Sequence, residues 1–183
     1  MTEVIIIPGL GGSGPNHWQS LWKEHHSHCQ ILSVDDWNMP DKEHWLASLE
    51  KMMSKCISAP LVVAHSLGGI LFVHWVSRHK SIPIKGALLV APPDVDDKHK
   101  IPAEATCFAP IPMTPLPFPS IVVASENDSF ASLQRSQAFA VAWGADFVNV
   151  GRCGHINSDS HLKDWNDGWK MLNSLNDSIE NQA

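Results

Sequence analysis

The sequence predicts an α/β fold in which a mostly parallel sheet carries helices on both faces. Short apolar runs alternate with amphipathic segments almost from end to end of the 183-residue chain. Most of the runs are β-branched, as buried parallel strands are, and repeated β–α alternation is typical of doubly wound sheets. The length suits one domain over residues 1–183, and no linker-like change in composition divides it.

Six segments are expected to form the strands. Each is four or five residues long, and most are bounded by Gly, Pro or Asp, which favour turns. In chain order they are Val4–Ile7, Ile31–Val34, Leu61–Ala64, Ala87–Ala91, Ile121–Ala124 and Phe147–Val150.

Helices are expected between these strands, where apolar residues recur on one helical face. One such stripe runs from Trp45 to Cys56, and Asp41 stands where an N-cap belongs. A weaker stripe from Leu133 to Trp143 precedes Gly144, a residue that favours a helix end. The stripe expected on the last helix consists of Leu162, Trp165, Trp169 and Leu172.

The charge and composition argue against several classes of partner. The 13 basic and 19 acidic residues give a net charge of −6 without a basic cluster, so we expect no nucleic acid or membrane partner. No apolar run approaches the roughly 18 residues of a membrane span, and the N-terminus lacks the pattern of a secretory signal. The four cysteines form no C-x-x-C pair. They are expected to be reduced thiols of a cytoplasmic protein, not a zinc site.

One segment interrupts the alternation. Pro92–Pro119 contains eight of the 13 prolines and shows no clear period. A long irregular stretch within a domain is often a functional loop, so this segment either shapes a substrate site or is a rigid surface excursion.

The first expected strand ends in a glycine-rich sequence, PGLGGSG at residues 8–14. Three of its glycines satisfy G-x-G-x-x-G, and Asp35 or Asp36 stands near the end of the next strand, a layout found in dinucleotide-binding units. Asp35 follows Gly9 by 26 residues, more than the usual distance of about 20. A turn of this kind also serves to direct a backbone N–H at an oxyanion. The motif alone leaves both interpretations open.

Residues 61–69, LVVAHSLGG, have the layout of a nucleophile elbow. A buried strand leads into a small-x-Ser-x-small turn and then a helix. Small residues at Ala64 and Gly68 are needed because larger side chains would collide with the neighbouring strand and helix. The sequence therefore predicts Ser66 as a nucleophile in strained backbone geometry. The alternative is an ordinary turn whose serine caps the helix.

A nucleophilic serine needs a base, and the base needs an orienting acid. In this class of sheet they follow the serine in the order acid, then histidine, at the ends of later strands. Asp128 follows the fifth expected strand and His155 the sixth. Glu126 on the same loop and Asp94 after the preceding strand are alternative acids. We expect Ser66, Asp128 and His155 to form the catalytic group.

The other histidines are expected to have ordinary roles. Three lie at residues 25–28 without a cysteine or acid at ligand spacing, which favours a solvated helix end over a metal site. His65 is expected to pack beside the nucleophile. Trp37 and Met39, together with segment 92–119, are candidates either for acyl contact or for plain packing.

With these residues in place, the chain resembles the small serine hydrolases grouped with retinoblastoma-binding protein nine and its bacterial YdeN-like relatives, over essentially the whole length. Four sequence patterns carry this resemblance, and three of them are short: H-S-L-G at 65–68, S-x-x-D at 125–128 and G-H-I at 154–156. The family often continues after the acid as D-P-F or D-P-Y, whereas Ser129 follows Asp128 here. The most specific element, P-G-x-G-x-S-x-x-x-H-W, is met by Pro8, Gly9, Gly11, Ser13, His17 and Trp18.

This resemblance implies a minimal α/β-hydrolase fold, with a six-stranded parallel sheet in the order 2-1-3-4-5-6. It implies catalysis by a triad without a cofactor or metal. It also favours the oxyanion interpretation of the glycine-rich turn, because Leu10 falls where the first backbone donor belongs. The backbone N–H of Leu67, directly after the nucleophile, is expected to be the second donor.

The expected function is therefore hydrolysis of small carboxylic esters, with thioesters and amides as further substrates. The expected partner is a small acyl compound bound in a shallow, open site, covered at most by segment 92–119. The alternative is a hydrolase fold that serves as a protein-interaction module with residual activity, with the same segment as its contact surface.

Overall fold

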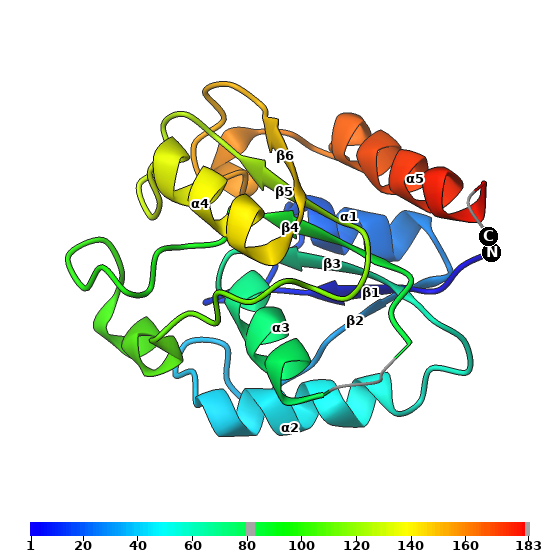
Figure 1. Ribbon diagram of the computed structural model, residues 1–183, viewed down its shortest axis with the longest axis horizontal. Helices are drawn as coiled ribbons and strands as arrows, with labels where there is room; N and C mark the ends of the chain where they lie inside the picture. Colours follow the sequence, from blue (N-terminus) through cyan, green and yellow to red (C-terminus); the bar gives the residue numbers. More distant parts are fainter. Residues whose placement is uncertain (80–82, 182–183) are drawn as a thin grey trace.

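The computed structural model describes residues 1–79 and 83–181. Its centre is a six-stranded parallel sheet in the order β2-β1-β3-β4-β5-β6, which confirms the expected fold class and strand order (Figure 1). The strands are β1 (Val4–Ile7), β2 (Cys29–Ile31), β3 (Leu61–His65), β4 (Gly86–Val90), β5 (Ser120–Ala124) and β6 (Asp146–Asn149).

Helices cover both faces of this sheet. α2, α3 and α4 bury their apolar sides in one core cluster, whereas α1 and α5 contribute to a second cluster on the opposite face (Figure 1). The α-helices are α1 (Trp18–His25), α2 (Lys42–Met53), α3 (Leu67–Arg78), α4 (Leu133–Trp143) and α5 (Asn166–Glu180), and two short 3-10 helices are η1 (Ala103–Phe108) and η2 (Ser158–Ser160).

The central strands are apolar on both faces because both faces are covered. In β3, Val62 and Ala64 belong to the cluster under α2–α4, and Leu61 and Val63 belong to the cluster under α1 and α5. All four are at most 3% exposed. Burial on both faces thereby fixes the position of the strand end, which is followed directly by Ser66.

The second strand lies earlier in the chain than expected. β2 covers Cys29–Ile31 and pairs with Val4–Ile6 of β1, whereas the sequence predicted Ile31–Val34. That prediction was wrong because the apolar run reports burial, not pairing. Leu32 and Val34 pack against the core from beyond the end of the strand.

The last helix begins later than its apolar stripe. Trp165 has φ 40°, a left-handed conformation, and α5 starts only at Asn166. Leu162 and Trp165 therefore belong to the preceding loop, although both pack in the same cluster as Leu172. The Trp165 ring packs directly on Gly168, where a Cβ would collide with it, so this position needs a glycine.

The start of α2 and the end of α4 are as expected. The Asp41 side chain caps α2 by accepting a 2.8 Å hydrogen bond from the His44 amide, and Gly144 ends α4 with φ 66°. α2 stops at Met53, so Cys56, the last residue of its predicted stripe, packs on the core from just beyond the helix.

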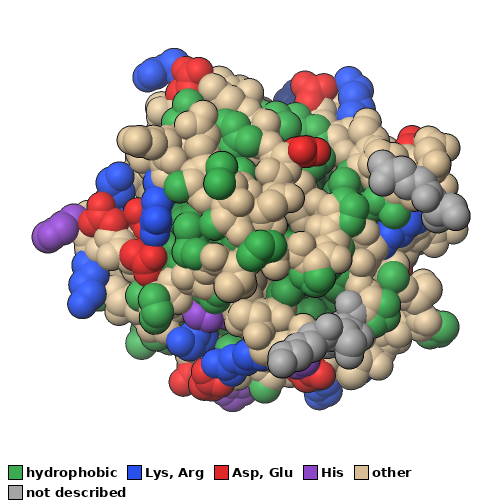
Figure 2. All heavy atoms as spheres, viewed as in Figure 1, with side chains coloured by type: hydrophobic (Ala, Val, Ile, Leu, Met, Phe, Trp, Pro, Cys, Tyr) green, Lys and Arg blue, Asp and Glu red, His purple; other side chains and the backbone are tan. Residues whose placement is uncertain are grey.

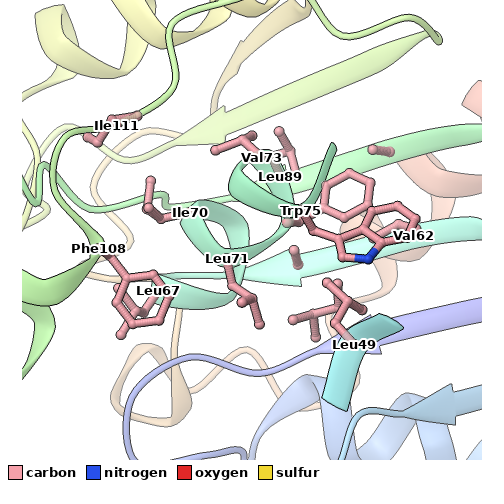
Figure 3. Close-up of a cluster of buried hydrophobic side chains, with 14 of the residues drawn as sticks. Leu49, Val62, Leu67, Ile70, Leu71, Val73, Trp75, Leu89, Phe108 and Ile111 are labelled. Carbon is pink, nitrogen blue, oxygen red and sulfur yellow. The ribbon is translucent and has the colours of Figure 1, made fainter. Parts of the chain in front are cut away.

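Segment 92–119 contains one 3-10 helix, η1, and is otherwise irregular. It is anchored by apolar side chains. Phe108 and Ile111 are buried against residues of α3, as Figure 3 shows, and the Ile111 amide donates to the Asp96 carboxylate over 3.1 Å. Phe108 and Ile111 therefore pack this segment onto the domain, whereas its exposed part at residues 98–100 lies in a loop at the edge of the molecule (Figure 1).

The surface mixes charges of both signs. Figure 2 shows Lys and Arg side chains beside Asp and Glu side chains around the rim of one face, with apolar side chains between them. Within residues 1–79 and 83–181, no helix is both long and apolar enough to cross a membrane.

Candidate active site

Ser66 lies at the junction of β3 and α3 with φ 54° and ψ −130°. A non-glycine residue in such a region costs about 1–3 kcal/mol and persists only where surrounding contacts hold it. One such contact is the 2.9 Å hydrogen bond from the Ser66 amide to the Val90 carbonyl. The Ser66 side chain makes no capping hydrogen bond to α3. The hydroxyl is therefore not used as an ordinary helix cap.

Two glycines allow the turn at Ser66 to pack against the loop after β1. A Cβ on Gly68 would lie 2.4 Å from the carbonyl oxygen of Pro8, and a Cβ on Gly9 would lie 2.8 Å from the Ser66 Cβ. No side chain fits at either position. The loop after β1 thus passes beside the turn, and Leu10 and Leu67 line one common cavity. Gly9 is used here for close packing on the serine turn.

Ser66, His155 and Asp128 form one hydrogen-bonded chain. The Ser66 Oγ is 2.7 Å from His155 Nε2, and His155 Nδ1 is 2.9 Å and 3.0 Å from the two carboxylate oxygens of Asp128. Because a carboxylate only accepts, the imidazole proton lies on Nδ1, and Nε2 is free to accept from the serine hydroxyl. The Asp128 side chain is 4% exposed and that of His155 12%, so the chain is largely shielded from water.

The two alternative acids have other partners. The Asp94 carboxylate lies 3.0 Å from Arg135 Nε, and Glu126 accepts a 3.0 Å hydrogen bond from the Asn149 side chain at the surface. Asp128 alone of the three candidates contacts His155. Its carboxylate also accepts from the Phe130 amide over 2.9 Å, which ties the acid to its own loop although serine follows it.

Two residues to which the sequence assigned no role, Ser125 and Asn127, connect the loop that carries Asp128 (the acid loop, residues 125–130) to the loop that carries His155 (the base loop, residues 151–156). The Ser125 hydroxyl accepts from the Cys153 amide and the Asn127 side-chain oxygen from the Gly154 amide, both over 2.9 Å. They fix the spacing between the loops of Asp128 and His155. Ser125 is the first residue of the S-x-x-D pattern, so that pattern carried a signal for this role.

A cavity of about 250 Å³ opens beside Ser66. Segment 92–119 contributes Pro93, Ile101, Pro102 and Ala105 to its lining, so the segment shapes the site and is more than a surface excursion. The remaining lining residues are Leu10, Gly12, Gly14, His17, His65, Ser66, Leu67, Phe130, His155, Asn157 and Ser158.

Trp37 and Met39 do not line this cavity. The carbonyl of Trp37 accepts from the Gly11 amide over 2.9 Å, and its ring packs against Gly12 and Trp45. Met39 is 67% exposed. Neither residue is therefore placed for acyl contact: Trp37 packs against the glycine-rich loop from outside the cavity, and Met39 faces solvent.

The histidines at residues 25–28 lie away from this cavity. The His26 ring stacks on Trp169 with 3.8 Å between centroids, and His25 pairs with Asp164. Burial, aided by the neighbouring His28 and His25, lowers the pKa of His26. Among the described residues, no three His, Cys, Asp or Glu side chains are grouped as metal ligands.

A parallel sheet in this order, with a strained serine at the end of β3, defines an α/β-hydrolase. Residues 4–174 match the family model described as serine hydrolase, and the chain belongs to this family. A comparison with curated protein sequences found no match.

Solved structures agree with this assignment. A YdeN-like hydrolase from Pectobacterium atrosepticum is 30% identical with a TM-score of 0.87, and the match covers 98% of this chain and 92% of that one. The ydeN gene product of B. subtilis is 22% identical with a TM-score of 0.76, covering 96% and 98%. Alpha/beta hydrolase domain-containing protein 10 from mouse shares the fold at 16% identity and a TM-score of 0.72, covering 99% and 90%. The expected resemblance to YdeN-like proteins is confirmed, and the likeness to retinoblastoma-binding protein nine stays a prediction.

Proposed function

We propose that this serine hydrolase cleaves small carboxylic esters through an acyl-enzyme formed on Ser66. The observation that carries the proposal is the hydrogen-bonded chain from the Ser66 hydroxyl through His155 to Asp128. Strain at Ser66, the shielded acid and an adjoining cavity support it.

In the first step, the Ser66 oxygen attacks the acyl carbon while His155 Nε2 takes the hydroxyl proton. The Asp128 carboxylate keeps the imidazole in the required tautomer and stabilises the imidazolium that forms. As the carbon–oxygen bond of the ester breaks, His155 returns the proton to the departing alcohol. A water molecule deprotonated by His155 then attacks the acyl carbon, which releases the acid and restores Ser66.

The negative charge that develops on the carbonyl oxygen needs donors that already point at it. We assign this role to the backbone N–H groups of Leu10 and Leu67, on the two segments that Gly9 brings into contact beside Ser66. Each donor of this kind contributes about 2.7–4 kcal/mol to transition-state stabilisation in other hydrolases.

The cavity supports small acyl groups as substrates. Its volume of about 250 Å³ is below the usual range of ligand pockets, roughly 300–1,000 Å³, and its walls include Leu10, Leu67, Ile101 and Phe130. Thioesters and amides of similar size fit the same chemistry. A net charge of −6 disfavours strongly anionic substrates, nucleic acid and anionic membranes as partners.

We also propose a cytoplasmic location. All four cysteines are free thiols, which suits a reducing compartment.

A panel of p-nitrophenyl esters with increasing acyl length tests this function, with Ser66→Ala as the blank. We expect short esters to be hydrolysed best, and kcat to fall by about 10⁴–10⁶ in Ser66→Ala, as in other triads. Wild-type rates in Ser66→Ala would contradict the role of the serine. A preference for long acyl chains would contradict the assignment of the cavity.

A further inference from the structure

The loop that carries His155 has a backbone that needs support from outside. Gly151 and Gly154 have φ 76° and 57°, and Ile156 has φ 51°. The left-handed region is a true exception for a β-branched residue. The Ile156 side chain is fully buried, so the strain is not relieved by solvent exposure. Such a conformation persists only when neighbouring contacts fix it.

His65 supplies one of these contacts. Its Nε2 lies 2.9 Å from the carbonyl oxygen of His155, and because a carbonyl only accepts, the His65 proton is on Nε2. Burial, with smaller contributions from His155 and His17, lowers the pKa of His65 well below its ordinary value, so the ring stays neutral. The residue directly before Ser66 thus holds the backbone of the residue that would activate Ser66.

Trp18 supplies a second contact, one residue further along the loop. Its indole Nε1–H donates to the carbonyl oxygen of Ile156 over 2.8 Å, and its side chain is 1% exposed. Trp18 is the first residue of α1, whose N-cap is His17. The His17 ring lies edge-on to His65, with 4.8 Å between centroids. Residues 17 and 18 of the N-terminal H-W pattern therefore meet His65 directly under the base loop.

The two contacts differ from packing alone. A neutral histidine and a tryptophan each carry one side-chain N–H, and here both are spent on consecutive carbonyls of one loop. On the other side of that loop, Ser125 and Asn127 accept from the amides of Cys153 and Gly154. Donors from α1 and β3 and acceptors from the acid loop therefore hold the base loop from two directions.

We propose that His65 and Trp18 are positioning residues, which hold the carbonyls of His155 and Ile156 so that His155 Nε2 stays within hydrogen-bond distance of the Ser66 hydroxyl. This role rests on the proposed function. Loss of either donor lets the base loop relax from its strained backbone and moves the imidazole away from Ser66. Trp18 does not line the cavity, so its loss should leave substrate binding much less affected than catalysis, whereas His65 is a lining residue and its loss also alters the cavity wall.

The test measures kcat and KM for a short p-nitrophenyl ester in three variants, His65→Phe, His65→Gln and Trp18→Phe, and in one control variant. His65→Phe keeps an aromatic ring without the donor, and His65→Gln places an amide N–H near the position of Nε2. We expect His65→Phe and Trp18→Phe to lower kcat about 10- to 100-fold, since small displacements of reacting groups have effects of this size. KM should change little in Trp18→Phe, because Trp18 does not line the cavity. His65→Gln should recover most of the lost kcat.

Trp22→Phe is the matched control. Trp22 is one turn further along α1, is 1% exposed and donates its indole N–H to the Asp164 carbonyl over 2.6 Å. It should lose thermal stability as Trp18→Phe does but keep kcat. The proposal is overturned if Trp18→Phe loses no more kcat than Trp22→Phe, or if His65→Gln is folded and no better than His65→Phe. Should both His65 variants fail to fold, the two tryptophan variants decide.

A measurement without substrate separates this proposal from the proposed function. The ¹⁵N shifts of the His65 ring in the wild-type protein report which nitrogen carries the proton. A proton on Nε2 supports the contact with His155, and a proton on Nδ1 overturns it. Wild-type protein that does not hydrolyse esters would defeat the proposed function and with it the positioning role of the two donors in catalysis. The shifts would still show whether the loop is held as described.

Discussion

Two of the segments that border the cavity beside Ser66 are held in place by different kinds of contact. The base loop, residues 151–156, is fixed by hydrogen bonds between its backbone and the side chains of Ser125, Asn127, His65 and Trp18. Segment 92–119 is fixed mainly by the burial of apolar side chains such as Phe108 against α3 (Figure 3).

This difference shows which part of the site has freedom to change. Hydrogen bonds are directional, and losing a buried partner costs about 1–3 kcal/mol, so the base loop tolerates little variation. Apolar packing accepts residues of similar volume at small cost. We therefore expect changes in the base loop to affect the reaction, and changes in segment 92–119 to affect cavity size and substrate range.

The largest effect on the base side is expected from Asp128→Asn. The amide would hydrogen-bond to the wrong tautomer of His155, and in another triad the same change lowers kcat about 10⁴-fold while the geometry stays intact. Asp94→Asn is the control, because Asp94 pairs with Arg135 and not with the base. Steady-state kinetics of both variants test the assignment. A loss of kcat in Asp94→Asn as large as that in Asp128→Asn would contradict it.

The next effect concerns His17, which lies under the base loop against His65. Burial, aided by His155, lowers the pKa of His17 from 6.5 to about 4, and no described group pairs with its buried Nε2. Between pH 6.5 and 4 the unfolded chain takes up a proton that the folded chain does not. Stability is therefore fully present above pH 6.5 and falls by about 3 kcal/mol toward pH 4.

Urea unfolding of His17→Asn at several pH values tests this linkage. Asparagine keeps a side-chain acceptor for the N-cap of α1 but does not titrate. The variant should lose less stability than the wild type between pH 6.5 and 4, and the remaining slope includes His65, which is shifted in the same direction. An unchanged slope would show that His17 is not held neutral by burial.

The smallest effect is expected on the segment side. Ala105 is 3% exposed and lines the cavity, so Ala105→Leu reduces the space for the acyl group. We expect kcat/KM for butyrate esters to fall about tenfold relative to acetate esters, the size expected for one or two methylene groups. Met39→Ala, outside the cavity, should leave this ratio unchanged. A ratio that shifts equally in both variants would remove segment 92–119 as the determinant of acyl size.

Much of the fold could be predicted from the sequence, because parallel strands that are buried on both faces consist of continuous apolar runs. The same signal misplaced β2, since Leu32 and Val34 are apolar for packing and not for pairing. Trp165 misled in a similar way. Its spacing fits the apolar stripe of α5, but its left-handed backbone keeps it outside the helix, and apolar periodicity does not report backbone conformation.

In the candidate site, too, some residues could be predicted from the sequence and others could not. Ser66, Asp128 and His155 could be predicted because strict spacing after strand ends determines where such residues meet, and the structure brings them together. The cavity wall could not be predicted, because Ile101 and Ala105 reach it through the packing of an irregular segment that has no period. Trp37 and Met39, which looked equally suitable in sequence, lie elsewhere.

The central claim, that His155 and Asp128 activate Ser66, is tested most directly by covalent labelling. A fluorophosphonate reacts with an activated serine, forming a phosphorus–oxygen bond as fluoride leaves. Peptide mapping by mass spectrometry should find one label, on Ser66, in the wild-type protein, and no label in Ser66→Ala or His155→Ala. Unlabelled wild-type protein, or a label that persists in His155→Ala at the wild-type rate, would contradict this claim.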